Sequence, residues 1–182
     1  EPLSEFHQEI ISRFATVFNQ TYTRFLDLQK AEAQTREAEI ELALERVRAR
    51  TMAMQHSDEL LDAATLLFQQ IEFLGAPTWN CSFNIWDKDR KHATAWNGTK
   101  EGFGRPFKSN SSENVYLDFY KGGQNGEKLF IKEIGGKVLE NHYKYMSTVP
   151  GVSETLAELK AAGVQLPTFQ IFYIAPLEMP PL

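Results

Sequence analysis

The longest regular stretch of polar and apolar positions runs from residue 21 to residue 56. It contains no Pro and no Gly, and nearly every residue between Gln29 and Gln55 is a good helix former. One apolar stripe has a 4-3-4-3 spacing, with Thr51 as a polar step, and consists of Ile40, Leu44, Val47 and Met54. A second stripe, interrupted by Glu45, consists of Ala38, Leu42, Ala49 and Met52. The pattern predicts one long helix with two narrow apolar stripes.

Such a helix would extend roughly 50 Å, because each residue adds about 1.5 Å, and this exceeds the width of a domain of ordinary size. It must therefore protrude or pair. Narrow, Ala-rich stripes favour pairing with a second copy of the same helix over packing on a sheet. The sequence predicts a homodimer through this helix; it favours a parallel pair and leaves an antiparallel pair open. The expected interface residues are Ala38, Ile40, Leu42, Leu44, Val47, Ala49, Thr51, Met52 and Met54.

Residues 1–20 have the apolar spacing of another helical stretch with a broad face. Ser4 is placed to cap it, since Ser is favoured at the position before a helix starts. The face consists of Phe6, Ile10, Ile11, Phe14, Val17 and Phe18. A terminal helix with so many aromatic residues lacks an evident packing partner. We therefore expect the chain to begin partway through a larger protein.

After the long helix, residues 57–75 predict a helix that faces a core. Its stripe consists of Leu60, Ala64, Leu67, Ile71 and Leu74, widened by Leu61 and Phe68. Two interpretations stay open at its start. Ser57 or Asp58 could begin it afresh, or the long helix could run through with a bend near His56.

The remaining chain predicts a small α+β domain. Residues 79–86 and 92–98 have strand character and flank a polar turn, so they predict a hairpin. A loop, a helix, a strand, two helices and a strand follow, at residues 99–112, 113–123, 128–134, 137–146, 153–163 and 166–176. Ser153 is the expected cap of the last helix. Because the strands do not alternate regularly with helices, we expect an antiparallel sheet with helices on one side.

Composition narrows the class of protein. The chain has 182 residues, of which 42% are hydrophobic and 24% charged, enough for one compact domain beside the helical arm. The net charge of −5 argues against a nucleic-acid partner. The chain has no signal peptide and no apolar run long enough to cross a membrane. Cys81 is the single cysteine, so no internal disulfide can form, which suits a reducing cytoplasm.

Candidate catalytic chemistry is sparse. The four histidines are scattered, and we find none beside Cys or acidic residues at a metal-ligand spacing. His56 could be a phosphoacceptor, but no ATP-binding motif follows, and a surface histidine is the preferred interpretation. Asp87 and Asp89 lie in a turn and are expected to be solvated. Cys81 is expected to be a buried small apolar residue. The sequence therefore predicts no catalytic residue, no metal and no cofactor.

The run Glu45–Met54, followed by Ser57–Leu60, resembles the signalling helix that precedes GAF-like sensory domains in bacterial multidomain sensor proteins, many of them histidine kinases of two-component systems. Residues 18–34 are similar to the linker between two successive sensory domains in those proteins. The resemblance implies that residues 1–56 are the closing helix of an upstream domain continuing into a signalling helix. Residues 57–182 would be a GAF-like domain whose sheet is incomplete at the C-terminal end.

The resemblance also implies a ligand pocket between the sheet and an overlying loop and helix. Its residues would be Trp79, Phe83, Trp96, Phe103, Tyr116, Tyr120 and Phe172. Plain core packing is the competing interpretation for each of them, because aromatic side chains fill cores without a ligand.

Three functions follow from the sequence as hypotheses. The first is a non-catalytic sensory fragment that relays a signal through a dimeric helix to an output domain outside this chain. The second is a small α+β enzyme with its active site under the 99–112 loop. The third is a structural oligomerisation module that binds no ligand.

Overall fold

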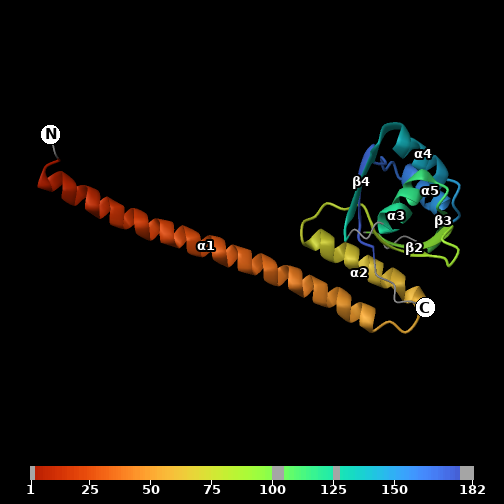
Figure 1. Cartoon of the computed structure of the whole chain (residues 1–182), viewed down its shortest axis with the longest axis horizontal. Coiled ribbons are helices and arrows are strands. Elements are labelled where there is room, and N and C mark those ends of the chain that lie inside the picture. The colour runs from red at the N-terminus through yellow and green to blue at the C-terminus, as the bar shows by residue number, and fades with distance from the viewer. Residues whose placement is uncertain (1–2, 100–104, 125–127, 177–182) are drawn as a thin grey trace. The chain divides into compact units, whose positions relative to one another are not determined.

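The computed structural model describes residues 3–99, 105–124 and 128–176. The chain divides into two compact units, Glu1–Arg48 and Ala49–Leu182. Helices and antiparallel strands together form the second unit, which confirms the predicted α+β class at the level of helix and strand content (Figure 1).

The helix α1 spans Glu5–Met52, and its 48 residues form one uninterrupted ribbon, coloured red to orange in Figure 1. The two predicted helical stretches are therefore continuous, because no Gly or Pro separates them. The Ser4 hydroxyl oxygen accepts a hydrogen bond from the backbone N–H of His7 at 3.4 Å, as expected for the predicted cap. The helix ends at Met52, four residues before the predicted end.

The chain restarts as a helix after a short break. His56 is extended, with φ −132° and ψ 150°, and a 3₁₀ turn η1 (Ser57–Glu59) leads into α2 (Leu60–Phe73). Of the two interpretations, the fresh start is therefore confirmed and the continuous bent helix is wrong. The turn begins at Ser57, one of the two predicted start residues. The Glu59 carboxylate accepts hydrogen bonds from the backbone N–H groups of Gln55 and His56, which precede the turn.

A three-stranded antiparallel sheet follows, in the order β1-β2-β3. The predicted hairpin is confirmed as β1 (Cys81–Trp86) and β2 (His92–Gly98). The third strand, β3 (Phe107–Asn110), lies in the segment 99–112, for which a loop prediction was wrong. Its side chains at Phe107 and Ser109 are buried opposite Ala95 and Ala93, so pairing with β2 stabilises a stretch that has little strand character of its own.

The remaining elements appear in the predicted order. They are α3 (Asn114–Gln124), β4 (Phe130–Gly135), α4 (Gly136–Met146), α5 (Val152–Ala161) and β5 (Phe169–Ile174). The residue that caps α5 is Gly151, whose φ of 86° suits glycine, and its backbone N–H donates to the Glu154 carboxylate at 2.7 Å. The predicted cap at Ser153 is therefore wrong, since that residue lies inside the first turn.

Within the described residues the strands form two sheets, not one, because β4 and β5 pair only with each other. Helices also cover both faces of the three-stranded sheet. At Gly98 an added Cβ would lie 2.2 Å from the Ala64 carbonyl oxygen of α2. Ala95, which points to the opposite face, packs in a core cluster with Tyr116 of α3. The expectation of helices on one side is therefore wrong.

Two buried clusters hold these elements together. The first joins β2, β3 and α3 to the end of α4 and consists of Ala95, Phe107, Tyr116 and Val149. The second joins α3, β4 and α4 and consists of Val115, Ile134 and Leu139. Phe119 packs against both clusters, so α3 is the element common to the two halves of the core.

The small β4–β5 sheet has one covered and one exposed face. Lys132 points to the covered face and forms an ion pair with Asp118 of α3 at 2.8 Å. The opposite face carries large apolar side chains that are 40–67% exposed, at Ile131, Phe169, Ile171 and Tyr173.

Candidate functional site

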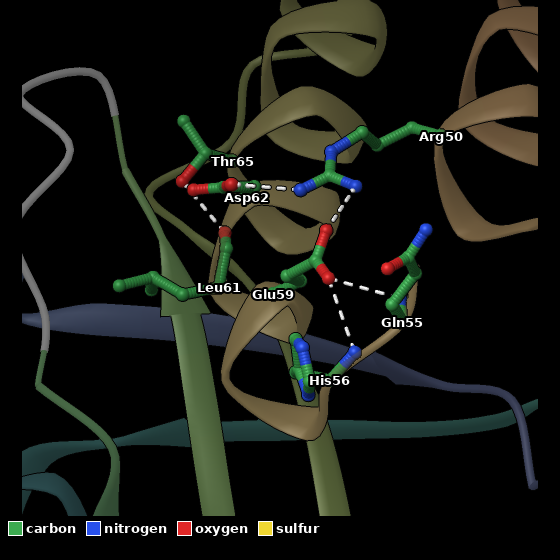
Figure 2. Close-up of polar contacts among 7 residues, drawn as sticks. All are labelled: Arg50, Gln55, His56, Glu59, Leu61, Asp62 and Thr65. Carbon is green, nitrogen blue, oxygen red and sulfur yellow. Dashed lines mark hydrogen bonds and ion pairs between the residues drawn. The ribbon is translucent and has the colours of Figure 1, made fainter. Parts of the chain in front are cut away.

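Arg50, in the last turn of α1, lies between two carboxylates of the segment that follows the break. Its Nη1 is 2.9 Å from Oε2 of Glu59, and its Nη2 is 2.8 Å from Oδ2 of Asp62 (Figure 2). The planar guanidinium therefore bridges the 3₁₀ turn and the first turn of α2. All three residues belong to the second compact unit.

The Glu59 carboxylate also fixes the backbone of the break. Its Oε1 accepts hydrogen bonds from the backbone N–H groups of Gln55 at 2.9 Å and His56 at 3.1 Å, as Figure 2 shows. The hydrogen bond from Gln55, followed by those from Arg50 and His56, lowers the pKa of Glu59 to about 2. The carboxylate is therefore charged throughout the physiological range, and one side chain holds both the end of α1 and the break.

The two arms of this arrangement, which we call the Arg50 fork, differ in exposure. The Arg50 and Glu59 side chains are 27% and 28% exposed, whereas Asp62 is 69% exposed. The hydrogen bonds that Arg50 donates, first to Asp62 and then to Glu59, raise the pKa of Arg50 above its usual value. Water screens the Asp62 arm more strongly, so Glu59 is the more important partner. The fork therefore holds the end of α1 in position against the turn that follows it.

The predicted dimer residues fall into two groups by exposure. Those that are half-buried in the single chain are Ile40, Val47 and Met54. Those that are exposed are Ala38, Leu42, Leu44, Ala49, Thr51 and Met52. Successive helix positions turn by about 100°, so the stripe that contains Leu42 and Met52 lies on the side of α1 opposite Ile40 and Val47. The stripe of Ala38, Leu42, Ala49 and Met52 is exposed at every position.

The predicted ligand residues are distributed over the core. Phe83 and Trp96 face each other across β1 and β2 as half-buried partners. Tyr116 is buried in the first core cluster, whereas Trp79 is 45% exposed. Phe103 lies outside the described residues.

Two further predicted ligand residues have aromatic neighbours. Tyr120 packs edge-on against Trp86, with ring centroids 5.3 Å apart. Phe172 packs against Phe119 at 5.0 Å and against His142 at 6.3 Å. Tyr116 lies 5.9 Å from the same histidine ring. The structure therefore brings Tyr116 and Phe172 together around His142.

His142 forms a buried polar pair with Glu113. Its Nδ1 lies 3.2 Å from Oε1 of Glu113, and the two side chains are only 8% and 11% exposed. The other oxygen of Glu113 accepts hydrogen bonds from the backbone N–H groups of Val115 at 2.9 Å and Tyr116 at 3.1 Å. Glu113 therefore caps α3 and binds α4 at the same time.

Asp87, Asp89 and His92 approach one another in the β1–β2 turn. One potential ligand atom of each lies within 4.8 Å of the others. The sequence had indicated no histidine at a metal-ligand spacing from acidic residues, so this grouping was not predicted. Lys108 donates to Asp87 at 3.3 Å and competes with any cation for that carboxylate. The three side chains are 39–53% exposed, so ordinary solvated side chains account for the group.

Neither the Arg50 fork nor the Glu113–His142 pair was predicted from the sequence. The fork had a local indication, because an arginine in the last turn of one helix precedes two acids in the first turn of the next. Glu113 and His142 are 29 residues apart, and no pattern links them.

Comparison with protein-family models, with curated proteins and with solved structures found no match for this chain. Among the described residues, none of the helices is both long enough and apolar enough to cross a membrane.

Proposed function

We propose that this chain is a non-catalytic sensory fragment of a bacterial signal-transduction protein. Its long helix pairs in parallel with that of a second copy, and the Ala49–Leu182 unit is a GAF-like sensory domain. A signal at that domain changes the rotation or register of the paired helices and so biases an adjoining output domain. The proposal places the protein in the cytoplasm.

The observation that carries the proposal is α1 itself. A helix of 48 residues with apolar side chains exposed along its length cannot bury them by itself, and helices in proteins owe most of their stability to packing. Leu42 and Met52, on the stripe that is exposed throughout, are 52% and 81% exposed. A second copy of the same stripe is a partner that would cover them.

The Arg50 fork supports the relay. Glu59 and Asp62 connect the last turn of α1 to the first turns of the segment that enters the domain. Rotation of the end of α1 would carry the guanidinium away from both carboxylates. A displacement of the start of α2 would therefore move the end of α1 as well, because the two are joined directly by these polar contacts.

The proposed ligand, if the domain binds one, is a small molecule held near the aromatic residues around α3. Of the predicted residues, Tyr116 and Tyr120 lie on α3, and Phe172 packs against Phe119 of the same helix. The small β4–β5 sheet supports the proposal of an incomplete GAF-like sheet, because its uncovered face carries large exposed apolar side chains that further structure would cover.

The test is the solution mass by light scattering over a dilution series, for the full chain and for a version that begins at Ser57. We expect a dimer for the full chain and a monomer for the short version. A full chain that stays monomeric at high concentration would overturn the relay. Ala49→Leu should raise the melting temperature of the dimer, because a leucine extends the exposed stripe of Leu42 and Met52. An unchanged melting temperature would count against that stripe as the interface.

A further inference from the structure

The first half of α1 carries a second, larger apolar surface that the predicted interface does not include. Its aromatic side chains recur every three or four residues and are 50–73% exposed, at Phe14, Phe18, Tyr22 and Phe25. Phe18 and Tyr22 stack with ring centroids 6.5 Å apart, and Tyr22 and Phe25 with centroids 6.4 Å apart. The rings therefore form a continuous row along one side of the helix.

Charges are confined to the other side of this segment. With about 100° per residue, an arc of roughly 120° contains the following positions between residues 7 and 29. They are His7, Gln8, Ile11, Phe14, Ala15, Phe18, Tyr22, Phe25, Leu26 and Gln29. None is an acid, a lysine or an arginine. The four charged residues of this segment, Glu9, Arg13, Arg24 and Asp27, all lie outside this arc. We call the ten residues the aromatic face; six turns of helix without a charge are typical of a face that is covered.

The shape of the aromatic face indicates what covers it. An open hollow lies between Ile10, Ile11, Phe14, Ala15 and Phe18. Four of these residues stand at positions i, i+3, i+4 and i+7, the diamond into which one side chain of a neighbouring helix inserts in a coiled coil. Ala15 has the smallest side chain of the four and leaves room for the inserted side chain. A hollow of this shape suits a side chain from another helix better than a flat sheet.

The area is sufficient for a stable pair. An aromatic side chain buries about 150–250 Å², so four that are half to three-quarters exposed offer roughly 500 Å² per chain. Two copies would cover roughly 1,000 Å² with these residues alone, which is the size at which specific interfaces begin. Ile11 and Leu26 add to this area. Because the same face is used on both copies, the pair closes on itself and does not polymerise.

We propose that the aromatic face of residues 7–29 is an interface with a second copy of this helix, formed by insertion of Phe14 and Phe18 side chains into the hollows of the partner. This interface lies N-terminal to residues 38–54, and it would stand even if the relay proposed above were wrong. By the same rotation of about 100° per residue, the aromatic face lies opposite the exposed stripe of Leu42 and Met52, so one straight pair of helices uses one contact or the other. The aromatic face is the stronger of the two, because its side chains are aromatic where the other stripe is rich in alanine.

The test compares two variants of the full chain that each add two negative charges. Phe18→Glu/Phe25→Glu places the charges on the aromatic face, and Gln20→Glu/Thr23→Glu places them on the opposite side of the same turns. All four positions are exposed, so both variants should keep the wild-type helix content by circular dichroism. Light scattering over a dilution series should show a dimer dissociation constant raised at least about 100-fold in the first variant and within about threefold of wild type in the second.

Three results would overturn the proposal. One is a wild-type chain that is monomeric at every concentration, as expected if an upstream domain covers the face instead. The others are two variants with equal dissociation constants, or a first variant that matches the wild type. A third variant, Leu42→Glu/Met52→Glu, separates this proposal from the relay. If it alone dissociates the dimer, the 38–54 stripe is the interface and the aromatic face is not.

Discussion

Oε1 of Glu113 lies 3.2 Å from Nδ1 of His142, and both side chains are about nine-tenths buried between α3 and α4. Burial raises the pKa of Glu113, but the hydrogen bonds from His142 and from the backbone N–H groups of Tyr116 and Val115 outweigh burial and hold the pKa below its ordinary value of 4.5. A charged carboxylate in the core is therefore part of the folded state. Its contacts tie the start of α3 to the middle of α4.

Replacing Glu113 by alanine should destabilise the domain by about 3 kcal/mol. The substitution removes the cap of α3 and leaves the imidazole of His142 without its buried partner. Chemical unfolding of the full chain, followed by tryptophan fluorescence, measures the change. Glu140→Ala, at an exposed position on α4, is the control and should change the free energy of unfolding by less than about 0.5 kcal/mol. Equal losses of unfolding free energy in the two variants would mean that the Glu113–His142 pair does not stabilise the domain.

The same carboxylate predicts a pH dependence on the acid side. Because the pKa of Glu113 is lower in the folded state than in the unfolded state, its contribution is present above the unfolded value of 4.5 and is lost as pH falls through the folded pKa. Below about pH 4.5 the free energy of unfolding of the wild type should therefore fall more steeply with decreasing pH than that of Glu113→Gln. The difference between the two curves isolates this residue from Glu59 and Glu154, whose pKa values are also lowered. Parallel curves between pH 6 and pH 3 would contradict the assignment.

The break after α1 should depend on Glu59 more than on Asp62. In Glu59→Ala the backbone N–H groups of Gln55 and His56 lose their acceptor, so we expect their hydrogen exchange to accelerate at least about tenfold. Asp62→Asn, the control, keeps both of these hydrogen bonds and should leave the exchange rates unchanged. In the wild type the Gln55 amide shift should titrate near pH 2, which is the pKa of Glu59. A midpoint near 4.5 would show that the bond is not formed in solution.

Much of the fold could be predicted because its determinants are local. The composition of residues 21–56 specifies a helix without help from the rest of the chain, and the hairpin is specified by two short strands around a polar turn. The strand β3 was missed because its sequence, FKSN, carries one large apolar residue and gains strand structure only by pairing with β2. The division into two sheets depends on which strands meet in space, and strand patterns along the chain do not encode that.

The candidate site shows the same limit. Arg50 and its acids lie within twelve residues of one another, yet a break separates them, and the way the chain turns there was not evident from the sequence. The contacts of His142 depend on α3 and α4 packing together, so no sequence spacing could reveal them. The aromatic residues predicted as ligand contacts came from the resemblance to GAF-like domains and from the elements on which they were expected to lie. Where each one lies was decided by its strand register and by the position of α3.

Gly98 is the position where β2 and α2 approach most closely, and it should not accept a larger residue. A Cβ there would lie 2.2 Å from the carbonyl oxygen of Ala64 and 2.4 Å from the backbone nitrogen of Thr65, so backbone would have to move. Gly98→Ala should therefore lower the free energy of unfolding by about 3 kcal/mol or more. Gly123→Ala is the matched control, because its nearest neighbour would be Pro176 at 3.8 Å, an ordinary contact. Gly123 lies inside α3, where alanine is the better helix former, so that variant should be neutral or up to about 1 kcal/mol more stable. If Gly98→Ala unfolds at the same denaturant concentration as Gly123→Ala, α2 does not lie against β2 in the way described.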